Sequence, residues 1–189
     1  MHLLQRFSRK RNIALTAFII SLSYFSIAQA GLPEINNTAS DILPDSIFRS
    51  VNFIPLTDAT RIMSGPVHLS DSSFKHKADY ILYKFNYRAN SIDSITCVRA
   101  DFSFGFEQYG QVTNTRDIYK AMKTACGSIT RVTELSFGDE GFVSVDAWNF
   151  PSIVVRKNNK LFKFWLYHVT NENSLQELKS VAEKVVSAY

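Results

Sequence analysis

The segment 95-ITCVRADFSFGF-106 decides the fold, because apolar and polar side chains alternate along it. Alternation with a period of two is the pattern of a β-strand that has one face on a hydrophobic core. The segment therefore predicts a strand over residues 95–106. Its apolar positions are Val98, Ala100, Phe102, Phe104 and Phe106, and the polar positions between them are Arg99, Asp101 and Ser103.

Other segments predict further strands of the same sheet. Residues 79–87 also alternate, whereas residues 160–168 are apolar on both sides, which indicates a central strand covered on both faces. Asn158-Asn159 just before that strand is a good sequence for a hairpin turn. We also expect strands over 128–135, 142–148 and 152–157, and a short strand within 67–74 that ends in a turn at 75–77.

Two segments have the period of a helix instead. In residues 113–126, Ile118, Met122 and Ala125 form an apolar stripe, with Thr113 or Asn114 as the cap and Gly127 as the stop. The last helix starts with a capping box from Ser174 to Glu177, followed by apolar residues at helical spacing. No repeat or linker divides these elements. The predicted fold is α+β: an antiparallel sheet of about five to seven strands, with a mid-chain helix and a C-terminal helix packed on it.

Residues 1–30 predict a signal peptide. A cationic cluster at 6–11 precedes an apolar run at 13–27, and Ala28-Gln29-Ala30 precedes Gly31, so cleavage is expected between Ala30 and Gly31. The alternative is an uncleaved anchor, but a membrane span needs about 20 mainly apolar residues, and serines dilute this run. Residues 31–65 are expected to be an irregular lead-in with a short helix within 40–52. Residues 66–189 are expected to form a single α+β domain.

Cleavage changes the charge of the protein. The whole chain has 21 Lys and Arg against 17 Asp and Glu, and four of the basic residues lie in the first 30, which contain no acid. The mature chain is therefore formally neutral, which argues against a nucleic-acid partner. We expect a periplasmic or secreted bacterial protein that contacts a membrane only through its signal peptide before cleavage.

Cys97 and Cys126 are the two cysteines of the chain. In an oxidising compartment, a single pair most simply forms one disulfide, worth roughly 3–4 kcal/mol for a loop of this length. The alternative is two free thiols. The alternation places Cys97 on the polar face of its predicted strand, so a bridge requires the helix on that face or a local bulge.

Two short segments supply candidate binding residues. Asp139 and Glu140, in Gly138-Asp139-Glu140-Gly141, could hold a cation or a basic group of a partner; alternatively, they form a polar turn between strands. Trp148 and Phe150 lie in one short connection. If exposed, they are an anchor for a protein or glycan partner; otherwise they cap one end of the core.

The sequence contains no recognisable catalytic motif. His68, His76 and His168 lack the spacing of a zinc site, and no nucleophile elbow, phosphate loop or dinucleotide fingerprint occurs. We therefore predict no metal, no cofactor and no catalytic residue. A less favoured alternative is an envelope hydrolase built on Asp139, Glu140, Asp146 or His168.

The C-terminal 76 residues resemble small exported bacterial domains of the PsbP-like α/β/α type. The resemblance is carried by Gly138-Asp139-Glu140-Gly141, by 154-VVRKNN-159 before an apolar strand, and by the helix pattern Leu178-x-x-Val181-Ala182-x-Lys184-Val185. Unlike the lipoproteins of that type, this chain has no lipobox cysteine at the cleavage site. The resemblance implies a binding or accessory protein and no enzyme activity.

The sequence thus favours a non-enzymatic exported protein that binds a protein partner in the cell envelope, as an inhibitor, an immunity factor or an accessory subunit. An alternative is a carrier of small hydrophobic ligands, which needs a cavity lined by aromatic side chains. The two functions require different surfaces. The positions of the aromatic residues in the fold therefore distinguish the two functions.

The signal peptide prediction is tested by N-terminal sequencing of protein purified from its native host. We expect the sequence to begin Gly31-Leu32-Pro33, because signal peptidase selects small residues such as Ala28 and Ala30. Ala30→Lys is expected to leave the segment attached. Native protein that begins at Met1 contradicts the prediction.

Overall fold

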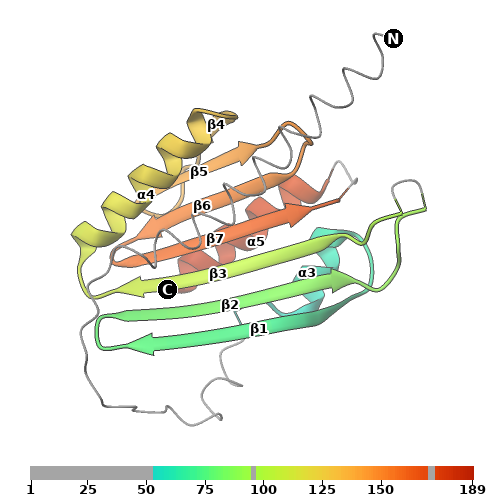
Figure 1. The fold of residues 1–189 in the computed structure, drawn as a ribbon, viewed down its shortest axis with the longest axis horizontal. Helices are drawn as coiled ribbons and strands as arrows, with labels where there is room; N and C mark the ends of the chain where they lie inside the picture. Colours follow the sequence, from blue (N-terminus) through green and yellow to red (C-terminus); the bar gives the residue numbers. More distant parts are fainter. Residues whose placement is uncertain (1–52, 95–96, 170–172) are drawn as a thin grey trace, which may run out of the picture. The chain divides into compact units, whose positions relative to one another are not determined.

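The computed structural model describes residues 53–94, 97–169 and 173–189, which form one antiparallel sheet of seven strands with helices on both faces (Figure 1). The strand order is β1-β2-β3-β7-β6-β5-β4. This confirms the predicted α+β fold with a mid-chain and a C-terminal helix packed on the sheet. The strands are β1 (Val67–Lys77), β2 (Tyr80–Ala89), β3 (Asp101–Tyr109), β4 (Arg131–Glu134), β5 (Glu140–Val145), β6 (Pro151–Lys157) and β7 (Lys160–Tyr167), and the helices are α3 (Leu56–Met63), α4 (Val112–Gly127) and α5 (Ser174–Ala188).

Strands β3 and β7 lie side by side in the middle of the sheet. Phe104 of β3 is opposite Phe164 of β7, and their ring centroids are 5.0 Å apart. Both side chains are completely buried. Strand β7 is the fourth of the seven, which confirms that its two-sided apolar pattern belongs to a central strand.

Helices α3 and α5 cover one face of the sheet, behind it in Figure 1. The buried side of α5 consists of Leu178, Val181, Ala182 and Val185, as the helical period predicts. These side chains join the aromatic side chains of β2, β3 and β7 in the main core. Complete burial of one such aliphatic or aromatic side chain contributes about 1.5–3 kcal/mol, so this face supplies most of the hydrophobic stabilisation.

Helix α4 covers part of the other face, in front of the sheet in Figure 1. Its Tyr119 is buried and lies against Phe142 of β5, with ring centroids 5.6 Å apart. The predicted stripe is therefore only partly right, because Ile118 and Met122 lie beside Tyr119 at the edge of this smaller core. Figure 1 shows α4 over the β4–β6 side of the sheet and away from β1 and β2.

The edge strand β1 contains a β-bulge. Leu69 is opposite Tyr87 and Asp71 is opposite Asn86, so Ser70 is an extra residue in the ladder. The Ser70 hydroxyl donates a hydrogen bond to the Asn86 carbonyl oxygen at 2.9 Å. A bulge bends and twists an edge strand, which makes the strand a poorer template for further pairing.

Several predicted strand boundaries are wrong. The strands predicted over 128–135 and 142–148 run over Arg131–Glu134 and Glu140–Val145 instead. The predicted turn at 75–77 is the end of β1, because Lys75 and Lys77 tolerate an edge position where their charges stay in solvent. The strand predicted over 95–106 runs from Asp101 to Tyr109 instead. Before it, the Cys97 N–H donates to the Asp93 carbonyl at 2.9 Å, and Cys97 has a φ of 55°, which breaks the extended conformation.

The predicted helix caps are also wrong. Helix α4 follows Gln111, and no side chain caps its first turn. The capping box at α5 does not form, because Ser174 lies inside the helix with its hydroxyl buried and without a partner among the described residues. The carboxylate of Glu177 instead pairs with Arg61 of α3, at 2.6 Å.

The N-terminal predictions fall largely outside the described residues. The signal peptide, its cleavage site at Ala30 and Gly31, and the helix expected within 40–52 all precede residue 53. In the last part of the expected lead-in, the structure places helix α3, and Phe53 and Ile54 are buried in the main core. No helix in the described part of the chain is long and apolar enough to cross a membrane.

The predicted disulfide between Cys97 and Cys126 is absent, and both cysteines are free thiols. The bridge required the helix on the polar face of the strand with Cys97, or a local bulge, but Cys97 lies in the exposed connection between β2 and β3 and not on a strand. Cys126 lies near the end of α4 and is partly buried. Burial raises the pKa of its thiol, and a hydrogen bond with Ser144 opposes this rise.

Thiol titration tests this correction. In the absence of reductant, we expect two reactive thiols in the denatured chain and only one fast thiol, Cys97, in the native chain. Cys126 is expected to react slowly at pH 8, because its burial and raised pKa keep the reactive thiolate scarce. Cys97→Ser should remove the fast phase alone. An unreduced, denatured chain with no reactive thiol contradicts the structure and restores the disulfide.

Candidate functional site

The longer connections of the sheet gather at one end, which we call the loop end. It comprises the described residues 90–94 and 97–100 between β2 and β3, 128–130 between α4 and β4, and 146–150 between β5 and β6. The strand register places them together, since Arg88 is opposite Asp101, Asp101 is opposite Tyr167, and Arg131 is opposite Val145. Connections on a rigid scaffold are where binding residues concentrate.

Large apolar side chains are exposed at the loop end. Trp148 is 48% exposed, and Ile92, Val98 and Ile129 are exposed as well. The four come from three separate connections. Isolated exposed apolar residues are common, and Leu56, Leu69, Val112 and Tyr189 are exposed outside these connections. The loop end differs in that its exposed apolar side chains lie on connections rather than on helices or strands. Sequence reasoning found Trp148 and missed the other three: Val98 and Ile129 were within predicted strands, and Ile92 was in a segment that carried no prediction.

The connection that carries Trp148 is held rigid by Asp146. One carboxylate oxygen, Oδ1, accepts the backbone N–H of Trp148 at 2.8 Å and that of Phe150 at 2.9 Å. The Asn149 N–H donates to the Asp146 carbonyl at 3.0 Å, and Asn149 has a φ of 63°, a left-handed conformation that asparagine tolerates. The backbone of the turn that carries the exposed Trp148 is therefore held in one conformation.

The two predicted aromatic residues have different environments. Trp148 is exposed, whereas Phe150 is half-buried and meets the rings of His168 and Tyr167 edge to face. The exposed-anchor interpretation thus fits Trp148, and the packing interpretation fits Phe150. The pKa of Tyr167 is raised to about 12, mainly by burial and then by the charges of Asp146 and Asp101.

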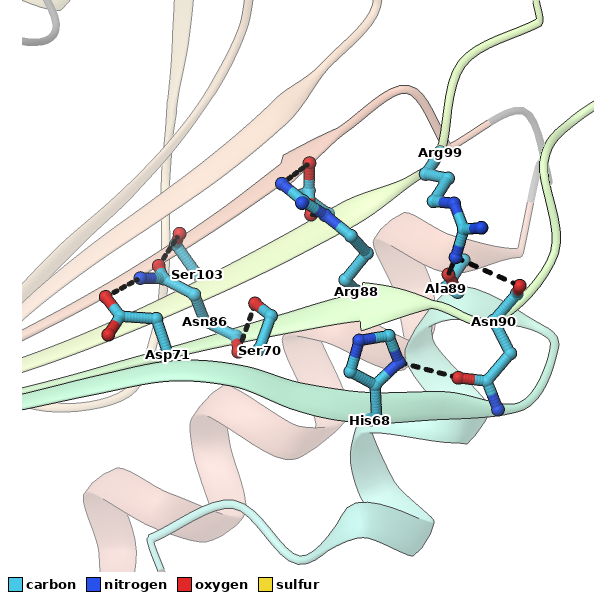
Figure 2. Close-up of polar contacts among 10 residues, drawn as sticks. His68, Ser70, Asp71, Asn86, Arg88, Ala89, Asn90, Arg99 and Ser103 are labelled. Atoms are coloured by element: carbon cyan, nitrogen blue, oxygen red, sulfur yellow. Dashed lines mark hydrogen bonds and ion pairs between the residues drawn. The ribbon is translucent and has the colours of Figure 1, made fainter.

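Ordered polar side chains border the loop end on β1, β2 and β3. Figure 2 shows Arg88 reaching Asp101, with Nε 2.8 Å from Oδ1 and Nη2 3.4 Å from Oδ2. His68 Nδ1 lies 2.7 Å from Asn90 Oδ1. The Arg99 Nη1 donates to the carbonyls of Asn90 at 3.1 Å and Ala89 at 3.4 Å. An exposed pair such as Arg88–Asp101 contributes only about 0–1 kcal/mol, so its main effect is to orient side chains.

A second row of hydrogen-bonded polar side chains crosses β1, β2 and β3 further from the loops. The Ser103 hydroxyl donates to Asn86 Oδ1 at 2.5 Å, and Asn86 Nδ2 donates to Asp71 Oδ2 at 3.2 Å (Figure 2). Asn86 is thereby held in one amide orientation. This side of β1–β3 is polar and ordered, as is usual for the rim of a protein interface.

Asp139 and Glu140 lie at the opposite end of the sheet from Trp148, which we call the far end. The six residues of β5 separate the two ends by about 17 Å at the usual rise of a strand. The guanidinium of Arg156 binds both acids, with Nε 2.6 Å from Glu140 and Nη1 2.9 Å from Asp139. Asp139 also accepts the N–H of Asn158 at 2.7 Å. The basic group that these acids hold is therefore a residue of the same chain.

The residues of the alternative hydrolase hypothesis do not form one cluster. Asp139 and Glu140 are at the far end, and Asp146 at the loop end uses its Oδ1 to accept two backbone amides. His168 lies at the loop end as well, where its ring packs edge to face against Phe150. Among the described residues, no group of three or more His, Cys, Asp or Glu is arranged to hold a metal ion.

The described hollows do not form an enclosed apolar cavity. One has a volume of about 540 Å³ and lies open to solvent between the β4–β5 connection and α5, and its lining includes Glu134, Lys179 and Glu183. The other has a volume of about 290 Å³ and lies beside Met63, Asp93 and His168 at the loop end. A carrier of hydrophobic molecules needs a mostly apolar pocket that encloses its ligand. The described residues therefore give the carrier hypothesis little support.

Sequence reasoning also missed a buried ion pair. Lys163 of β7 binds Glu107 of β3, both nearly inaccessible to solvent, and the Tyr109 hydroxyl donates to Glu107 at 2.5 Å. Burial, with the nearby Glu107 charge, raises the pKa of Tyr109 strongly. The available signal was a single lysine within the apolar sequence 161-LFKFWL-166. Each charge requires the other, because an unpaired buried charge is costly.

Comparisons of the chain with models of known protein families, with curated proteins and with solved structures find no match. The resemblance to PsbP-like domains therefore stays a prediction. Inference about function rests on the geometry of the site.

A substitution at Gly138, next to the Arg156 ion pairs, tests the close packing at the far end. It has a φ of 77°, and an added Cβ lies 2.4 Å from Val155 Cγ1 and 2.9 Å from the Arg156 carbonyl. We expect Gly138→Ala to lower the free energy of unfolding by about 2–4 kcal/mol, since overpacking and backbone strain combine. Urea denaturation measures this change.

Gly65→Ala is the matched control for that measurement. An added Cβ at Gly65 meets nothing within 4 Å, so we expect a change of less than about 1 kcal/mol. Equal midpoints for the two variants contradict the described packing of Gly138.

Proposed function

We propose that the protein is a non-enzymatic binding protein of the bacterial cell envelope that recognises another protein through its loop end. The observation that carries this proposal is the exposed Trp148 on a turn fixed by Asp146. Tryptophan in solvent gains nothing for the fold. Rigid presentation reduces the entropy lost on binding, and buried tryptophan is the residue type that contributes most at protein interfaces.

The size of the loop end supports a protein partner rather than a small molecule. From Arg88 on β2 to Val145 on β5, the sheet crosses four strand spacings, or about 19 Å. A standard protein interface covers about 800 Å² on each side, so its diameter includes both the Trp148 turn and the polar side chains near Arg88. The apolar residues with ordered polar groups around them match the anatomy of such an interface.

Site-specific photocrosslinking in the native host tests the proposal. A benzophenone amino acid at position 148 is expected to yield a covalent adduct with one envelope protein. The same probe at Val112 should yield none, because Val112 starts α4 at the other end of the sheet. No adduct at position 148 in cells that express the folded protein contradicts the proposal.

Two matched valine substitutions then test which end of the sheet contributes to the affinity for the captured partner. Val98 is 39% exposed at the loop end, and Val112 is 42% exposed at the other end. We expect Val98→Ala to weaken binding about fivefold, the effect of losing roughly 1 kcal/mol of interface contact, and Val112→Ala to leave it unchanged. Isothermal titration calorimetry distinguishes the two. Equal effects of both substitutions argue against recognition at the loop end.

A further inference from the structure

Resting on the proposed function, we infer that the partner presents a carboxylate to Arg99, so that an acidic protein surface borders the apolar contact at the loop end. Main-chain carbonyl groups fix the orientation of the Arg99 side chain. Its Nη1 donates to the carbonyls of Ala89 and Asn90, at the end of β2 (Figure 2). These two bonds fix the plane of the guanidinium while its side chain stays exposed.

The fixed guanidinium has one edge left for an acceptor. Nη1 is used by the main chain, which leaves the edge formed by Nε and Nη2, the edge that binds a carboxylate with two parallel hydrogen bonds. No described residue accepts a hydrogen bond from this edge of Arg99. In the neighbouring Arg88, the same edge is occupied by the carboxylate of Asp101. Arg88 therefore shows, within this chain, the geometry that Arg99 is ready to adopt with a partner.

Arg99 differs from Arg88 in having no carboxylate partner among the described residues. His68 and Arg88 lie on the same side of the sheet near Asn90 (Figure 2). Among the acids of this region, Asp101 is paired with Arg88, Asp146 accepts backbone amides, and Asp93 lies in the same connection as Arg99, where its N–H donates to the Val98 carbonyl. Val98 and Arg99 are neighbours in the same connection and both are exposed, so both are accessible to a partner at the loop end. Partial exclusion of water by such a partner strengthens a bond between charged groups.

Charge reversal in the photocrosslinking experiment tests this inference. With the probe at position 148, Arg99→Glu is expected to reduce the adduct about tenfold, because a like charge then faces the partner's acid. Arg99→Lys keeps the charge but loses the two-bond edge, so an intermediate yield is expected. Arg116→Glu is the control, since Arg116 is an exposed arginine of α4 outside the loop end. Circular dichroism melting curves establish that each variant is folded.

The salt dependence of binding gives an independent readout with the purified partner. Raising sodium chloride from 50 to 500 mM is expected to slow association of the wild-type chain about tenfold and that of Arg99→Gln much less. An adduct yield and a salt dependence unchanged in Arg99→Glu and Arg99→Gln overturn this inference and leave the proposed function intact. Absence of any adduct at position 148 overturns both.

Discussion

The contact between the aromatic rows of β3 and β7 is the constraint on which the rest of the structure depends. Phe102, Phe104 and Phe106 alternate along β3, and each lies opposite an apolar residue of β7 in the antiparallel register. A shift of the register by one residue moves all three rings to the other face of the sheet. The pairing therefore fixes which face receives α3 and α5 and which face receives α4.

The same pairing decides where the two ends of the sheet lie, and these ends differ in character. At the far end, Arg156 joins the β4–β5 connection to the β6–β7 turn through Asp139 and Asn158, so polar groups there satisfy one another. At the loop end, hydrogen bonds orient side chains without covering them, as the Trp148 turn and Arg99 show. Polar groups at the far end are thus paired within the chain, whereas side chains at the loop end stay exposed.

The sequence predicts the sheet well because β2 and β3 keep a period-two pattern and β7 is apolar on both sides, as its central position requires. It predicts the edges less well. Lysines at 75 and 77 resemble a turn but lie on an edge strand, and an exposed Val98 resembles a strand residue but lies in a connection. Alternation reports side-chain polarity and not backbone conformation, so it cannot detect the turn at Cys97.

The candidate site follows the same logic. Trp148 is recognisable because a tryptophan in a short connection has few roles, whereas Asp139 and Glu140 look equally suited to a ligand or to Arg156. Only the pairing of β5 with β6, which places Glu140 opposite Arg156, decides between these. The orientation of Arg99 depends on two carbonyl groups, and main-chain acceptors leave no trace in a sequence.

The extra residue in β1 has a consequence for how molecules of this protein behave at high concentration. An eleven-residue border strand with regular pairing invites a neighbouring molecule to extend the ladder, and such extension repeated is how fibrils grow. Ser70 turns its hydroxyl back onto Asn86 and interrupts that regularity near the start of the strand. A single serine outside the core thus makes this border a less regular template for a second molecule.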